Sequence, residues 1–132
     1  MRMMKLVKNN GIYWEFIREL RNHPDVKTGF IKQEHISKKQ HYRFMEKHGL
    51  KYFICLFDNS PAGYVGVING DIRVATHPEY QGLGVAKYMI NELMKMYPES
   101  YAKVKMDNEA SIKLFESCGF NKKYYILEKK EC

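Results

Sequence analysis

The feature that most constrains this fold is a strand, a glycine-containing turn and a helix that follow one another directly. Residues 71–76 alternate between two faces of a strand, and residues 82–97 repeat apolar side chains at helical spacing before Pro98. The turn between them reads Gln81-Gly82-Leu83-Gly84-Val85-Ala86. Glycine allows close backbone approach, and a helix N-terminus offers unpaired N–H groups. The junction predicts a diphosphate site, with a plain tight turn as the alternative.

The other elements alternate along the chain and predict one mixed sheet with helices packed on it. Asn69-Gly70 is a strong hairpin signal between two strands. We expect strands over residues 3–8, 51–57, 62–68, 71–76, 101–106 and 120–128. We expect helices over residues 11–21, 37–48, 82–97 and 108–118, while residues 26–36 are ambiguous.

Length, charge and cysteine content limit the classes of protein to consider. The 132 residues fit a single domain, 1–132, and a net charge of +7 favours anionic ligands. Because the basic residues never form a run of five, a nucleic-acid-binding tail is not indicated. The three cysteines have no metal-ligand spacing and suit a reducing cytoplasm, and no stretch resembles a signal peptide or a membrane span. We expect no metal and no membrane partner.

A second motif identifies the family that the chain resembles. The stretch from Asn108 to Gly119-Phe120 pairs an asparagine with a Gly-Phe dipeptide twelve residues later. Together with Gln81-x-x-Gly84-x-Ala86, it resembles the acetyl-CoA-binding segments of GNAT N-acetyltransferases. The resemblance covers roughly residues 50–127, and residues 1–49 would then cover the acceptor.

The resemblance implies a GNAT fold of the α/β (α+β) class, with a mixed sheet of about six strands, a V-shaped splay and four flanking helices. The strands at 71–76 and 101–106 would part to admit the pantetheine arm. Acetyl-CoA would serve as co-substrate. The implied cofactor-binding residues are Val74, Ala75, Thr76, Gln81, Gly82, Leu83, Gly84, Val85, Ala86, Asn108, Ser111 and Phe115.

The implied reaction is direct attack of a primary amine on the thioester, with a backbone N–H near residues 74–76 meeting the oxyanion. Many relatives carry at position 115 a tyrosine that protonates the leaving thiolate, and Phe115 cannot. We consider Tyr124, Tyr80, Tyr97 or water as the acid. Asp71 and His41 are the candidate bases, and a turn residue and an exposed histidine are the respective alternatives.

The resemblance implies that the N-terminal third of the chain selects the acceptor. Arg21-Asn22-His23-Pro24 and Ile36-Ser37 through His41 resemble segments of bacterial acetyltransferases that act on nucleotide-linked amino sugars. Such an acceptor suits the net charge and the many aromatic residues, with Arg21 pairing a diphosphate. A peptide acceptor and a non-catalytic acetyl-CoA-binding module remain alternatives. Since only one strand is expected after Phe120, we expect a second molecule to complete the sheet edge in a homodimer.

Overall fold

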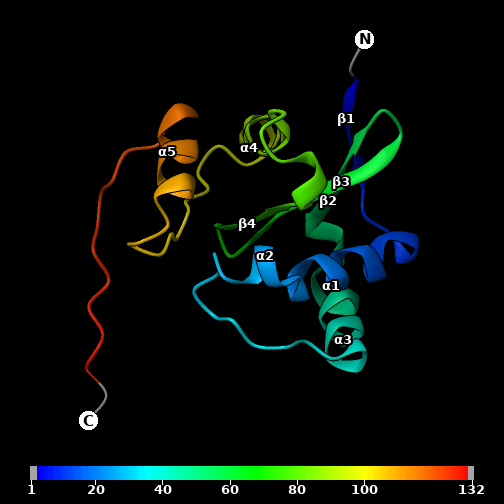
Figure 1. Cartoon of the computed structure of the whole chain (residues 1–132), viewed down its shortest axis with the longest axis horizontal. Helices are drawn as coiled ribbons and strands as arrows, with labels where there is room; N and C mark the ends of the chain where they lie inside the picture. The colour runs from blue at the N-terminus through cyan, green and yellow to red at the C-terminus, as the bar shows by residue number, and fades with distance from the viewer. Residues whose placement is uncertain (1–2, 131–132) are drawn as a thin grey trace.

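The computed structural model describes residues 3–130, in which a four-stranded antiparallel sheet separates two layers of helices (Figure 1). The strands pair in the order of the sequence. They are β1 (Met4–Lys8), β2 (Tyr52–Phe57), β3 (Ser60–Ile68) and β4 (Asp71–Thr76). The four expected strands in this part of the chain are therefore confirmed, with shifts of a few residues at their ends.

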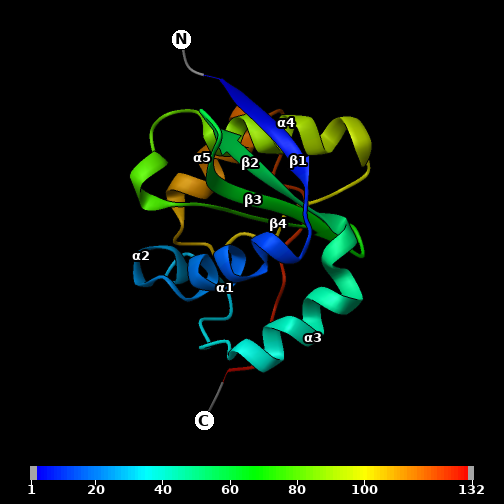
Figure 2. The same ribbon diagram turned by 90° about the vertical axis from the view of Figure 1, so that its right-hand side faces the viewer.

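The helices lie on opposite faces of the sheet, as Figures 1 and 2 show from two directions. One face is covered by α1 (Trp14–Asn22), α2 (Pro24–Lys27) and α3 (Lys38–His48), and the other by α4 (Val85–Met96) and α5 (Glu109–Ser117). Short 3-10 turns occupy Gly11–Tyr13, Gly49–Lys51 and Pro78–Tyr80. There are five α-helices in residues 3–130 instead of the four expected, because Pro24 starts a new short helix.

Local sequence signals explain most of these boundaries. Asn69 and Gly70 both have positive φ angles and form the tight β3–β4 hairpin. Ser37 caps α3 in a capping box with Gln40, as its position suggested. The helix expected from residue 82 begins only at Val85, because the turn before it holds glycines in the left-handed region.

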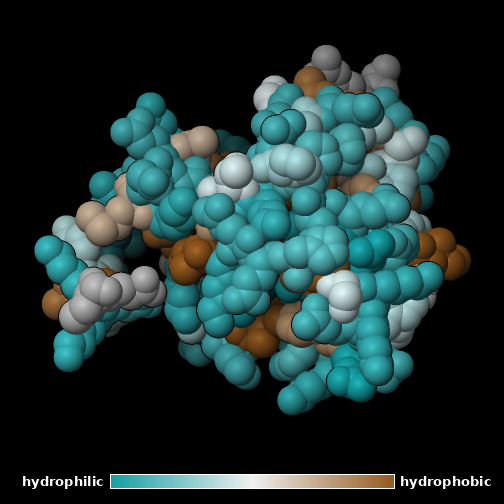
Figure 3. All heavy atoms as spheres, turned by 60° about the horizontal axis from the view of Figure 1, so that its bottom comes forward, coloured by the Kyte–Doolittle hydropathy of each residue, from teal (hydrophilic) through white to brown (hydrophobic). Residues whose placement is uncertain are grey.

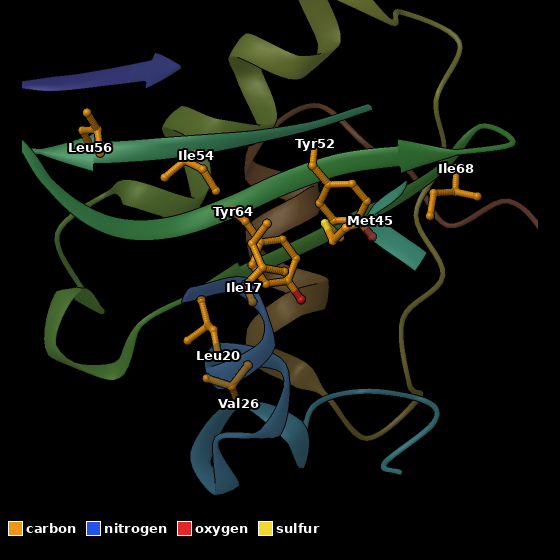
Figure 4. Packing of buried hydrophobic residues seen from close by; sticks show 10 residues of the cluster. Ile17, Leu20, Val26, Met45, Tyr52, Ile54, Leu56, Tyr64 and Ile68 are labelled. Atoms are coloured by element: carbon orange, nitrogen blue, oxygen red, sulfur yellow. The ribbon is translucent and has the colours of Figure 1, made fainter. Parts of the chain in front are cut away.

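Each face of the sheet has its own hydrophobic cluster. The cluster facing α1 and α3 is drawn in Figure 4; its buried members are Ile17, Leu20, Val26, Met45, Tyr52, Ile54, Leu56, Tyr64, Ile68 and Ala75. The cluster facing α4 and α5 consists of Cys55, Phe57, Ala62, Val65, Ile72, Val85, Met89, Ile90, Leu93 and Phe115. The two tyrosines in the first cluster matter for the site, because they carry polar groups into an otherwise apolar layer.

The expected strands at residues 101–106 and 120–128 are not formed in residues 3–130, and the expected mixed six-stranded sheet is corrected to four antiparallel strands. Tyr101 alone pairs with β4, through an isolated parallel bridge to Asp71. The Ile72 N–H donates to the Tyr101 carbonyl at 2.9 Å, and the Tyr101 N–H donates to the Gly70 carbonyl at 2.8 Å. Beyond Tyr101 the chain leaves β4 and leads to α5, so the bridge marks the point from which the two segments diverge.

Residues 121–130, named here the C-terminal segment, continue past α5 in an extended course along one side of the molecule (Figure 1). All of their side chains are exposed. None of the helices in the described residues is long and apolar enough to span a membrane.

Candidate functional site

The divergence of β4 from the segment after Tyr101 leaves a cavity of about 1220 Å³ between them. Both helical layers contribute to its walls, since it reaches around the open edge of the sheet. Its lining comes from residues 21–36, Tyr52, Tyr64, β4, residues 80–87, residues 103–108 and the first turns of α5. A second pocket, between α1 and His77, measures only about 120 Å³.

The open edge of β4 presents backbone groups to this cavity. The Ile72 N–H points away from β3 and reaches Tyr101, whereas the His77 N–H points the other way, to the Ala62 carbonyl at 2.7 Å. Backbone groups alternate in direction along a strand, so Val74 and Thr76 point to the same side as Ile72. No strand follows on that side within residues 3–130. Val74 and Thr76 can therefore pair with an extended ligand.

The turn before α4 forms one end of the cavity. Gly82 and Gly84 have φ angles of +78° and +83°, and Gly84 is the N-cap of α4 without any side-chain cap. Within residues 3–130, none of the N–H groups of residues 82–87 is recorded as donating to a protein group. These donors and the positive end of the helix dipole lie at the cavity, which Lys87 also lines.

The first turn of α5 forms the opposite wall. Asn108 is the N-cap: its Oδ1 accepts a hydrogen bond from the Ser111 N–H at 3.2 Å, and its Nδ2 donates to the Gly29 carbonyl at 3.2 Å. Phe115 is buried and packs edge-on against Phe120, with centroids 5.2 Å apart. Asn108 therefore ties α5 to the loop after α2 across the cavity.

One polar atom at the cavity has no protein partner. The Thr76 Oγ1 is buried and forms no hydrogen bond among the described residues. Thr76 is also a lining residue, at the end of β4 and near the turn that precedes α4. Because a buried hydroxyl normally finds a partner, this atom is suited to meet a ligand.

The remaining wall, toward α1, combines aromatic hydroxyls with charged side chains. Tyr52 and Tyr64 are buried, their ring centroids lie 5.8 Å apart, and both line the cavity. Burial raises the pKa of Tyr52 to about 12 and raises that of Tyr64 as well, so both hydroxyls stay protonated. Asp71 and Arg73 line the same wall as an ion pair, with a 3.3 Å contact.

Arg21 is held at this wall by a network behind it. His41 is fully buried, and its Nε2 lies 2.8 Å from the Trp14 carbonyl, which can only accept a hydrogen bond. The Nε2 therefore carries the proton, and Nδ1 accepts from the Arg21 Nη1 at 3.2 Å. Burial, and then the Arg21 charge, lower the pKa of His41 to about 4, which keeps the ring neutral. The Arg21 guanidinium also stacks on Phe44 at 5.0 Å.

The cavity gathers most of the residues singled out from the sequence. Asp71 lines it, and so does every cofactor-binding candidate except Leu83. His41 and Tyr124 do not: His41 is sealed behind Arg21, and Tyr124 is 83% exposed in the C-terminal segment. Neither position is suited to the acid–base role considered for it. Of the other tyrosines considered, Tyr80 lines the cavity and Tyr97 does not.

Sequence reasoning missed Tyr52, Tyr64 and Arg73 as site residues. The two tyrosines lie in apolar strands, so the sequence pattern predicts that they belong to the hydrophobic core. Their polar hydroxyl groups, one in each of two neighbouring strands, could have indicated a site. Among the described residues, no group of three or more His, Cys, Asp or Glu side chains is placed to hold a metal ion.

Comparison with known families gives one match. Residues 12–120 match the sequence profile described as Acetyltransferase (GNAT) family. The matched stretch contains both glycine-bearing motifs and all of the residues that line the cavity. No curated protein sequence matches the chain.

Comparison with solved structures supports the fold. A domain from Methanocaldococcus jannaschii superposes with a TM-score of 0.81 at 20% identity, covering 93% of this chain and 91% of that one. Spermidine N-acetyltransferase from Vibrio cholerae, in complex with CoA and spermine, gives 0.79 at 20% identity, covering 96% and 85%. The aminoglycoside N-acetyltransferase AAC(6')-Iy in complex with CoA gives 0.72 at 18%, covering 100% and 97%. At these identities the likeness concerns the fold alone.

Proposed function

Because this chain belongs to the acetyltransferase (GNAT) family, whose members use acetyl-CoA, we propose that it transfers the acetyl group directly to a primary amine held in the cavity. The observation that carries the proposal is the two-ended cavity along the open edge of β4. The end at the turn before α4 offers unpaired backbone donors. The end toward α1 offers tyrosine hydroxyls and paired charges. In this proposal, residues 50–127 hold acetyl-CoA and residues 1–49 cover the acceptor, within one unit.

The residues at the turn fit the pyrophosphate of acetyl-CoA. The free N–H groups of residues 82–87 and the Lys87 side chain supply hydrogen bonds and positive charge. The outward backbone of Val74 and Thr76 would pair with the amides of the pantetheine arm, and the unpartnered Thr76 hydroxyl offers a further contact. Asn108 and Ser111 line the far side of this path.

Acetyl-CoA supplies the activated acetyl group as a thioester. For the transfer, the backbone N–H of Val74 or Thr76 would stabilise the negative charge that develops on the carbonyl oxygen. The acceptor must present a neutral amine, so its proton has to leave before the C–N bond forms and the C–S bond breaks. Asp71 is the candidate base, because it lines the cavity beside the end of β4 that meets Tyr101.

Position 115 offers no proton to the leaving thiolate, since Phe115 has no hydroxyl. Tyr80 lines the cavity, but it lies close to the turn that would hold the pyrophosphate, and the whole pantetheine arm separates that end of the cofactor from its sulfur. A thiolate leaves without protonation when no acid is available, so we propose that water takes this role.

The acceptor that we favour is a nucleotide-linked amino sugar. Arg21 is held at the cavity by His41 and Phe44, and Arg73 lies on the same wall, so two guanidinium groups are available for a diphosphate. Phe30 is half-buried and offers aromatic surface for a base or a sugar ring. The basic net charge of +7 would draw such an anion toward the site.

A cationic acceptor is the second candidate. Asp25, Glu34 and Asp71 also line the cavity, and carboxylates at this wall would suit a polyamine. A spermidine N-acetyltransferase and an aminoglycoside N-acetyltransferase are among the solved structures with the same fold.

The test is thiol release from acetyl-CoA with a panel of amines: UDP-linked amino sugars, polyamines, aminoglycosides and peptides. We expect turnover with the UDP-linked amino sugars, and activity restricted to another class would reject that acceptor. If acetyl-CoA binds but no amine in the panel releases thiol, the chain is better described as a non-catalytic acetyl-CoA-binding module.

Two variants separate the roles at the site. Arg21→Gln should raise the KM for the UDP-linked acceptor at least tenfold and leave the KM for acetyl-CoA unchanged. Asp71→Asn should lower kcat and leave both KM values close to wild type. A polyamine whose KM is unaffected by Arg21→Gln and raised by Asp71→Asn would favour the cationic acceptor.

A further inference from the structure

Two buried tyrosine hydroxyls at the wall toward α1 have no partner in the protein. Tyr52 and Tyr64 are only 2% and 3% exposed, yet within residues 3–130 neither hydroxyl has a hydrogen bond. The fully enclosed side-chain oxygens without a partner in this part of the chain belong to Asn9 and Thr76 instead. The small accessible part of each tyrosine therefore includes its hydroxyl, and both residues line the cavity.

Two small residues make room for these rings beside β4. Tyr52 pairs in the sheet with Gly66, and a Cβ built on Gly66 would lie 2.8 Å from the Tyr52 ring. The ring therefore lies over Gly66, whose neighbour across the sheet is Arg73 of β4. Tyr64 pairs with Ala75 of β4, another small residue. Figure 4 shows the two rings leaning the same way from their strands, and their centroids are 5.8 Å apart.

Charged side chains surround the two hydroxyls. Arg21, Arg73 and Asp71 line the same wall, and all three charges act on the pKa of Tyr52, although burial has the largest effect and raises it. Because both hydroxyls stay protonated, each can donate one hydrogen bond and accept another. A hydroxyl group of a ligand both donates and accepts, so it matches this pair, whereas a methylene group satisfies neither hydroxyl.

A ligand reaches the two hydroxyls through the cavity. Figure 3 shows a hollow between the α5 side of the molecule and the main body, and the cavity lies between the same parts. Asp71, the candidate base, lines the cavity together with the tyrosines. An acceptor whose amine lies at Asp71 would therefore place its neighbouring atoms near Tyr52 and Tyr64.

We propose that Tyr52 and Tyr64 are specificity-determining residues, which select an acceptor that carries a hydroxyl group beside its amine. Such an acceptor is an amino sugar, and the acceptor excluded is one whose amine has only methylene neighbours, such as a polyamine. The inference rests on the acetyl transfer proposed above and decides between its two candidate acceptors. A site of this kind rejects a substrate without the matching group, because its own buried polar groups are then left unpaired.

Matched acceptors test the selectivity. Thiol release from acetyl-CoA is measured with a UDP-linked amino sugar and with its analogue that lacks the ring hydroxyl next to the amine. We expect the wild type to prefer the hydroxylated acceptor about a hundredfold in kcat/KM. Tyr52→Phe and Tyr64→Phe should each reduce this preference roughly tenfold and leave the KM for acetyl-CoA unchanged. Tyr97→Phe is the control, because Tyr97 does not line the cavity, and it should keep the wild-type preference.

Stability separates a role in selectivity from a role in the fold. Phenylalanine keeps the packing of each ring and removes a hydroxyl that has no partner in the described chain, so no protein hydrogen bond is lost. We expect the Tm of Tyr52→Phe and of Tyr64→Phe, without ligand, to equal or exceed that of the wild type. A fall of several degrees in both variants would assign the hydroxyls to the fold and overturn the proposal.

Failure of this inference differs from failure of the proposed function. Thiol release whose preference for the hydroxylated acceptor is the same in the wild type and both phenylalanine variants would overturn the role of the tyrosines and leave acetyl transfer in place. Turnover confined to polyamines would do the same. Absence of thiol release with every amine would reject the proposed function itself, and this inference with it.

Discussion

Gly84 holds the turn at the start of α4 in a conformation that residues with a side chain rarely adopt. Its φ angle is +83°, and a Cβ placed there would meet nothing within 4 Å in the described chain. The cost of Gly84→Ala therefore comes from the backbone, on the order of 1 kcal/mol, and not from a clash. A methyl group would, however, enter the space that we assign to the pyrophosphate.

We predict that Gly84→Ala weakens acetyl-CoA binding at least tenfold and that Gly84→Glu abolishes it, as measured by isothermal titration calorimetry. Gly119 gives a matched control, because it has a φ angle of +92° with nothing within 4 Å and does not line the cavity. Gly119→Ala should lose similar stability and keep wild-type affinity. Equal loss of affinity in both alanine variants would assign the effect to general destabilisation.

His41 makes the fold sensitive to mild acid. Its pKa is lowered from 6.5 to about 4 by burial and by Arg21, so the unfolded chain binds a proton more readily than the folded chain between these values. The contribution to stability is complete above pH 6.5 and is lost as the pH falls toward 4. At 1.36 kcal/mol for each pKa unit, the loss amounts to roughly 3 kcal/mol.

We therefore predict that the free energy of unfolding falls between pH 6.5 and pH 4 and that His41→Asn reduces the slope in this window. The amide of asparagine can still accept from Arg21 but does not titrate. Urea denaturation at several pH values provides the measurement, with the slope of the variant subtracted from that of the wild type. Identical slopes would mean that other groups cause the pH dependence.

At the residue scale, the sequence predicted the placement of residues 81–86 in one turn better than the placement of the side chains at the wall toward α1. Residues 81–86 are adjacent in the chain, so their turn geometry could be inferred from local glycine and helix signals. His41 and Arg21 lie twenty residues apart, and only the packing of α3 on α1 shows that the histidine faces inward. Tyr52 and Tyr64 become neighbours only through the pairing of β2 with β3.

Among the elements, α5 connects two parts of the site through one side chain. Asn108 caps the helix with its Oδ1 and holds the loop at Gly29 with its Nδ2. A serine at this position can keep the cap but is too short to reach Gly29. The substitution Asn108→Ser therefore removes only the contact with Gly29, whereas Asn108→Ala removes both that contact and the helix cap.

We predict that Asn108→Ala lowers the free energy of unfolding by about 2 kcal/mol, the sum of a lost cap and a lost hydrogen bond, and that Asn108→Ser lowers it by about 1 kcal/mol. Chemical denaturation measures both values. We also expect Asn108→Ser to raise the KM for the acceptor, because the loop at residues 28–36 lines that end of the cavity. Equal destabilisation by serine and alanine would show that the contact with Gly29 contributes nothing.

The elements that sequence patterns predicted correctly are those that carry their own signals. The hairpin at Asn69-Gly70, the capping box at Ser37 and the cap at Asn108 each depend on residues close together in the chain. Residues 101–106 and 120–128 have the composition of strands, yet a strand also requires a partner with free backbone groups. The sequence of a segment does not show whether such a partner is present. Within residues 3–130, Tyr101 is the one residue of these two segments that pairs with a strand.

On the scale of the whole molecule, the cavity is lined by parts of the chain that are far apart in the sequence. The loop after α2, the edge of β4, the turn before α4 and the start of α5 all line it. A ligand that touches several of these parts binds the folded chain and not the unfolded one. Its binding energy therefore adds to stability, by about 2.7 kcal/mol at a concentration one hundred times its Kd.

We predict that acetyl-CoA at this excess raises the Tm by several degrees and slows amide exchange in three separate stretches: 74–76, 82–87 and 108–111. The N–H groups of residues 82–87 have no recorded protein acceptor in the described chain, so they should exchange fast without ligand and become protected when phosphate oxygens accept from them. Amides in β1 and β2, which are already paired, should change little.

The Gly84→Glu variant is the control for this measurement, because it leaves the other walls of the cavity intact and should show neither the Tm shift nor the new protection. Protection limited to residues 108–111 would place acetyl-CoA away from the turn and contradict the assignment of the pyrophosphate site. Protection of 82–87 without that of 74–76 would mean that the pantetheine arm does not follow β4. The three stretches together distinguish a ligand lying along the open strand edge from one held at the helix N-terminus alone.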